Sequence, residues 1–106
     1  MTEGERRPRL EDLRLEDFAP ITGETFSMRV SEDLEVPVEL VEATSLGARP
    51  LEGRPEAFAL VFRGPPDLRA AQGIYRIEHE RLGVLEIFVV PIGPDATGMR
   101  YEAIFN

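Results

Sequence analysis

The single histidine of the chain, His79, is the side chain best suited to chemistry. Histidine serves as a general base or a metal ligand because its unperturbed pKa lies near neutrality. Here it stands between Glu78 and Glu80, and consecutive side chains of an extended segment cannot all face one ion. Since no second histidine and no cysteine completes a metal site, we interpret His79 as a solvated histidine in a turn.

Paired carboxylates are the second possibility, because two acidic groups can share acid and base roles, as in glycoside hydrolysis. Glu39, Glu86 and Glu102 fall in the middle of predicted strands. Each belongs to a half-polar face, so we expect these side chains to face solvent, with Arg76 or Arg100 as cross-strand partners. No serine or threonine sits in a nucleophile elbow, and no glycine-rich loop precedes a helix. The sequence therefore predicts a protein that is not an enzyme, with no catalytic residue, cofactor or metal.

Two neighbouring segments organise the rest of the chain, Gly73–Glu78 and Val84–Val90. Polar and apolar residues alternate in the first, which is typical of a half-buried strand. The second is apolar on both faces apart from Glu86, and such a strand is usually covered on both sides. The short link between them ends in Gly83, which favours a hairpin.

Apolar residues also alternate in four other segments, which predicts further strands at Thr25–Val30, Val36–Ala43, Ala57–Arg63 and Arg100–Phe105. Pro37 and Pro91 cannot donate a ladder hydrogen bond, so each should lie at an edge or strand end. Turns rich in glycine and proline separate the segments. We therefore predict an all-β fold, a small antiparallel six-stranded barrel or sandwich.

The ends of the chain complete this organisation. Leu10–Ala19 favours a short helical turn around Leu15–Phe18 that stops before Pro20. Residues 1–9 are polar and charged, so we expect a disordered tail, followed by a single all-β domain over residues 10–106. The predicted core comprises Phe26, Met28, Val38, Leu40, Phe58, Leu60, Phe62, Tyr75, Ile77, Leu85, Ile87, Val89, Tyr101, Ala103 and Phe105.

Composition excludes several classes of function. The 106 residues suffice for one domain, and the absence of cysteine excludes a disulfide framework. A formal net charge of −8 disfavours nonspecific binding to nucleic acid or to anionic membranes. No apolar run approaches the roughly 20 residues of a membrane span, and the N-terminus lacks the apolar core of a signal peptide. We expect a cytoplasmic protein.

A second apolar face lies opposite the predicted core. Its members are Val41, Val61, Ile74, Phe88, Val90 and Ile104. In a closed barrel they would point outward, and an apolar outer patch is either covered or forms an interface. Two alternatives stay open: the Leu13–Phe18 segment and the loop at 44–56 cover this face, or a protein partner or a second copy does.

Several stretches resemble an uncharacterised bacterial family, a domain of unknown function. They are residues 15–18, 23–26 and 62–65, QGIYRIEH at 72–79, FVVPIGP at 88–94 and GMRYEAIFN at 98–106, and together they cover most of residues 13–106. The resemblance implies no activity, cofactor or catalytic residue. Some members are encoded beside phage-tail-collar-like proteins, which implies an accessory or assembly role linked to phage-tail-like proteins.

We therefore expect a noncatalytic protein-interaction or assembly module that engages a protein partner or associates with itself. The alternative is a small β-barrel that binds an apolar ligand, with Tyr75 and Tyr101 as polar contacts. That alternative requires an internal cavity of a few hundred Å³.

Overall fold

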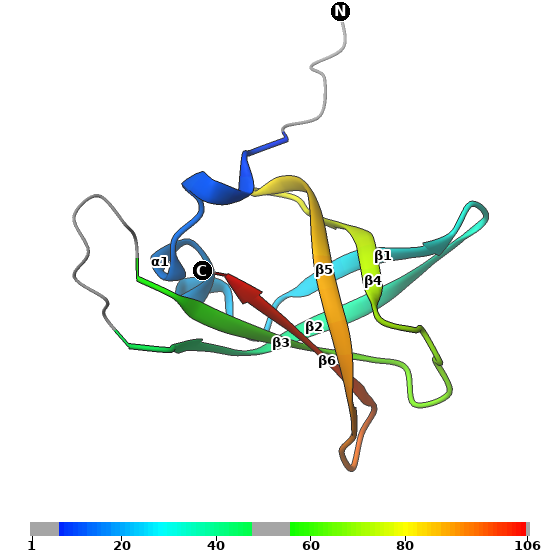
Figure 1. Cartoon of the computed structure of the whole chain (residues 1–106). Helices are drawn as coiled ribbons and strands as arrows, with labels where there is room; N and C mark the ends of the chain where they lie inside the picture. The colour runs from blue at the N-terminus through cyan, green and yellow to red at the C-terminus, as the bar shows by residue number, and fades with distance from the viewer. Residues whose placement is uncertain (1–6, 48–55, 106) are drawn as a thin grey trace, which may run out of the picture.

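Six antiparallel strands close into a barrel in the computed structural model, which describes residues 7–47 and 56–105 (Figure 1). Around the barrel the order is β1-β2-β3-β6-β5-β4, and β4 pairs with β1 to close it. The predicted all-β fold is confirmed, as a barrel rather than a sandwich. Every predicted strand is present, and the observed bounds are β1 (Thr25–Ser31), β2 (Leu34–Ser45), β3 (Phe58–Gly64), β4 (Gly73–His79), β5 (Gly83–Pro94) and β6 (Met99–Phe105).

The predicted hairpin is formed by β4 and β5, which pair along the whole of β4. Gly83 has a φ of 91°, a conformation that residues with a Cβ rarely adopt, so glycine suits this turn. β2 and β5 extend beyond the predicted Val36–Ala43 and Val84–Val90: β2 runs from Leu34 to Ser45, and β5 continues through Pro91 instead of ending there. Both prolines lie where the strand has one neighbour: β2 meets β3 only from Glu39 onward, and the β4 ladder of β5 ends at Val89. Proline lacks an N–H, and on the side of a strand that has no neighbouring strand this loses no hydrogen bond of the sheet.

Alternating side chains from all six strands fill the barrel. The predicted core residues are buried, apart from Tyr75 and Phe105, which are half-buried and pack against the core. Phe62 and Tyr101 are fully buried, and the rings of Phe26 and Phe62 meet edge to face with centroids 5.3 Å apart. Close packing of such large side chains makes this interior a major source of stability.

The N-terminal segment lies at the end of the barrel where β5 begins and β6 ends (Figure 1). It contains the helices η1 (Leu10–Asp12), α1 (Leu15–Phe18) and η2 (Ala19–Ile21), which confirms the predicted helical turn. Phe18 is fully buried, and its ring centroid lies 5.8 Å from those of both Phe58 and Phe105. Leu13 and Ile21 join the same core. The segment therefore contributes side chains to the barrel core, and the predicted core did not include them.

Some predictions fall outside the described residues. These include residues 1–6 of the expected tail and 48–55 of the expected loop, while Thr44 and Ser45 belong to β2. Within the described residues, the structure has no helix of the length and apolar character needed to cross a membrane.

Candidate functional site

His79 is buried, with 2% of its side chain exposed, so the predicted solvated turn histidine is wrong. Its Nδ1 accepts a hydrogen bond from the backbone N–H of Arg81 at 3.1 Å. The ring proton must therefore reside on Nε2, which donates to Oε1 of Glu24 at 2.8 Å. The Phe26 ring packs beside the imidazole, with centroids 4.6 Å apart. Sequence reasoning missed this contact because Glu24 is far from His79 along the chain.

The surroundings of His79 indicate a structural role. Both carboxylate oxygens of Glu24 also accept hydrogen bonds from Nη2 of Arg81, each at 2.9 Å. The pKa of Glu24 lies below its ordinary value, chiefly because the His79 side chain donates to it, with Arg81 adding to the effect and desolvation opposing it. Since both ring nitrogens are engaged, neither offers a lone pair to a substrate. The cluster ties the start of β1 to the β4–β5 turn.

The three mid-strand acids do not form a catalytic pair. Glu39 on β2 and Glu86 on β5 are both exposed, on strands that are not neighbours in the barrel. Glu39 forms an ion pair with Arg63 at 3.4 Å, a partner that the sequence analysis did not propose. Glu102 is half-buried and pairs in register with Val61 and Val90. Among residues 7–47 and 56–105, no three His, Cys, Asp or Glu side chains gather where a metal ion could bind.

The predicted outer apolar residues divide into two groups. Val61 is 6% exposed, and Val41 and Val90 are half-buried. In contrast, Ile74 is 70% exposed, Phe88 51% and Ile104 48%. The structure therefore leaves three of the six open to solvent, on β4, β5 and β6.

These three exposed side chains form a row across neighbouring strands, which we call the apolar row (Ile74, Phe88 and Ile104). Ile74 and Phe88 are register partners in the β4–β5 ladder. The β5–β6 ladder pairs Val90 with Glu102, and side chains two residues along point to the same face, so Phe88 and Ile104 both point outward. Phe88 thus stands at the centre of the row.

The barrel wall opens on both sides of the β4–β5 hairpin. β4 pairs with β1 only through Arg76–Glu78, which leaves Gly73–Tyr75 without a partner strand on that side. β5 pairs with β6 only from Val90 onward, so Gly83–Val89 has only β4 as a neighbour. A groove lies at each opening.

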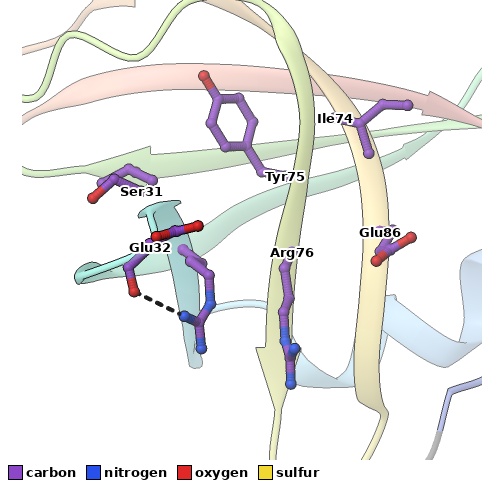
Figure 2. Close-up of a pocket in the computed structure, with 8 residues that line it drawn as sticks. Ser31, Glu32, Ile74, Tyr75, Arg76 and Glu86 are labelled. Atoms are coloured by element: carbon purple, nitrogen blue, oxygen red, sulfur yellow. Dashed lines mark hydrogen bonds between the residues drawn. The ribbon is translucent and has the colours of Figure 1, made fainter.

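The β1–β4 groove has a volume of about 470 Å³. Figure 2 shows Ser31 and Glu32 on the side of the β1–β2 hairpin, with the Tyr75 ring reaching from β4 toward them. Arg29 lines the groove as well, and its two terminal nitrogens are engaged: Nη2 pairs with Glu35 at 2.7 Å and Nη1 donates to the backbone oxygen of Glu32 at 3.2 Å, while Nε is buried without a hydrogen-bond partner among the described residues. Ile74 of the apolar row forms part of the same wall.

The β5–β6 groove has a volume of about 330 Å³. Its lining consists of Leu10, Glu11, Ile87, Phe88, Ile104 and Phe105. Ile87 and Phe88 are consecutive and point to opposite faces of the sheet, yet both line this groove. The groove is therefore a gap in the wall, at the place where the two strands separate. It separates Phe88 from Ile104 within the apolar row, and the β1–β4 groove borders the row at Ile74, so the row and the two grooves together are the candidate site.

Comparison with known proteins gives a family and no activity. The model of a family described as a domain of unknown function, DUF6916, matches residues 13–105. No curated protein matches the chain, and no solved structure does.

Proposed function

This chain belongs to the DUF6916 family, a domain of unknown function, and we propose that it is a noncatalytic protein-interaction module that docks a partner on the apolar row. The observation that carries this proposal is the exposure of Ile74, Phe88 and Ile104 on adjoining strands, since clustered apolar side chains rimmed by polar ones mark interaction sites. An accessory role beside phage-tail-like proteins, as the sequence resemblance implies, would suit such a module.

Charge favours a different protein over a second copy as the partner. The net charge of −8 opposes self-association, because two copies would repel each other. Glu86 lies two residues from Phe88 on β5, and Glu102 lies two residues from Ile104 on β6. Glu86 lies opposite Arg76 in the β4–β5 register, and Arg76 also pairs with Glu78 at 2.8 Å, so two carboxylates lie around this one guanidinium. A partner that combines apolar side chains with lysine or arginine would complement this surface.

Binding of an apolar ligand inside the barrel has less support. Tyr101 and the large side chains around it fill the interior. The hydroxyls that would contact a ligand are engaged by the backbone: Tyr75 donates to the Ala71 oxygen at 2.6 Å, and Tyr101 accepts from the Ala70 nitrogen at 3.2 Å. These contacts favour the outer face over the interior as the binding surface.

Affinity isolation from the native host, compared between variants, tests the proposal. Phe88→Thr and Ile74→Thr remove apolar surface but keep a residue suited to strands, so their stability should stay within about 1 kcal/mol of wild type. We expect recovery of the partner to fall by about ten-fold or more, as for central interface residues. The matched control is Leu46→Thr, because Leu46 is 50% exposed and follows β2, which lies across the barrel from β5. Equal recovery with all variants would contradict the proposal.

A further inference from the structure

The first half of β5 presents an unpaired backbone edge at the β5–β6 groove. Val84–Val89 spans about 20 Å at ~3.3 Å per residue. One side of this segment pairs with β4, but the ladder to β6 begins only at Val90. In an antiparallel strand, alternate residues direct their N–H and C=O groups to opposite sides, so about half of these groups point into the groove.

The N-terminal segment lies beside this edge without pairing to it. Leu10 and Glu11 line the groove, yet no hydrogen bond joins Leu10–Ile21 to Val84–Val89. No residue of η1 is buried, whereas Phe18 and Ile21 are anchored in the core. η1 is therefore less firmly anchored than the rest of the segment, and a chain that replaced it in the groove would also cover Ile87, a buried core residue of the lining.

The unpaired groups determine which kind of chain fits. The N–H and C=O groups inside a helix bond to each other, so they are not free to form hydrogen bonds with a strand edge. An extended segment presents N–H and C=O groups at matching intervals and can add to the sheet as another strand. Its alternate side chains would lie over Phe88 and Ile104, which line the same groove.

From this geometry we infer that the partner inserts an extended segment as an added strand on the Val84–Val89 edge of β5, with apolar and basic residues two positions apart on its outward face. This inference rests on the proposed function and specifies the form of its partner. Phe88 and Glu86 are two residues apart on β5, as are Ile104 and Glu102 on β6, so all four lie on the outward face. The outward apolar side chains of the segment cover Phe88 and Ile104, and its outward basic ones, two positions along, meet Glu86 and Glu102. A second copy of this chain fits less well, because each copy carries a net charge of −8.

The test measures amide hydrogen exchange and chemical shifts by NMR on the full chain. The probe is a capped synthetic peptide of about eight residues, enough to span the edge, in which every second residue faces outward. Its outward positions alternate isoleucine with lysine, and its inward positions are valine. In the free protein, the Val84–Val89 amides that point into the groove should exchange quickly. Peptide at saturation should slow their exchange by about ten-fold or more, equivalent to about 1.4 kcal/mol. The matched control has the same sequence and charge with alternate backbone nitrogens methylated, and it should give no protection.

The remaining outcomes separate this inference from the proposed function. Peptide that shifts the Phe88 resonances without slowing exchange in β5 would overturn strand addition and leave docking on the apolar row intact. Equal protection by the methylated peptide, or no binding of either peptide, would also overturn strand addition. Protection that grows with protein concentration in the absence of peptide would identify a second copy as the added strand, contrary to our inference.

Discussion

At the scale of single residues, the contact between His79 and Glu24 decides how the one histidine is used. The sequence places His79 between two acidic neighbours, which suggested a solvated turn. In the fold, Glu24 approaches from the start of β1 and occupies Nε2, while the Arg81 amide occupies Nδ1. The histidine becomes a buried connector between distant segments, because a paired imidazole is far less costly to bury than an unpaired one.

This contact predicts an acid-dependent loss of stability. The folded pKa of Glu24 is below its ordinary value, so its contribution is complete at neutral pH. That contribution is lost as the pH falls from about 4.3, the usual glutamate pKa, through the lowered folded value. We expect Glu24→Gln to lose less stability than wild type between neutral pH and about pH 3.5. Urea denaturation at both pH values measures this, with Glu80→Gln as an exposed control that should behave like wild type. Equal losses in wild type and Glu24→Gln would contradict the assignment.

At the scale of elements, alternation in the sequence predicted all six strands and most of the core. It could not predict where neighbouring strands separate, because each ladder end depends on the tilt of strands distant in sequence. It also missed the bulge at Val41, where the β2–β3 register shifts between Leu40 and Glu42. That extra residue brings Ala43 into register with Leu60, so Ala43 packs on the core, whereas strict alternation would put it on the same face as Val41.

The candidate site was predicted in part for the same reason. All six proposed residues point away from the predicted core by strand parity, but exposure depends on what lies above each one. Val61 is buried on β3, while Ile74 is open beside the β1–β4 groove. The burial of Phe18 was not predicted because its segment is too short to show a helical or strand repeat of apolar residues. The sequence therefore does not indicate which side of the segment is buried.

The β4–β5 turn gives a prediction at this scale. Gly83→Ala places a Cβ on a residue with a φ of 91° and should destabilise the fold by about 1–2 kcal/mol. Gly73→Ala in β4 is the matched control, because its added Cβ would meet only the Tyr75 ring, at an ordinary 3.9 Å. Denaturant unfolding of both variants measures the difference. An unchanged midpoint for Gly83→Ala would show that the turn tolerates a side chain.

At the scale of the whole molecule, a filled barrel with an acidic surface exposes one row of large apolar side chains beside two gaps in its wall. The filled interior supplies stability, so the row is not needed to hold the fold together. Ile74, Phe88 and Ile104 are exposed to solvent in the free protein, which is unfavourable for apolar side chains. Their burial under a partner would therefore favour binding. We therefore propose that a partner binds on the outside of β4, β5 and β6.

Photo-crosslinking in the native host tests this claim most directly. A benzophenone side chain replaces Phe88 in one variant and Leu46 in the other, since both positions are about half exposed. The account predicts a crosslink from position 88 to a protein other than itself, with no such product from position 46. The same products from both positions, or none from position 88, would contradict it.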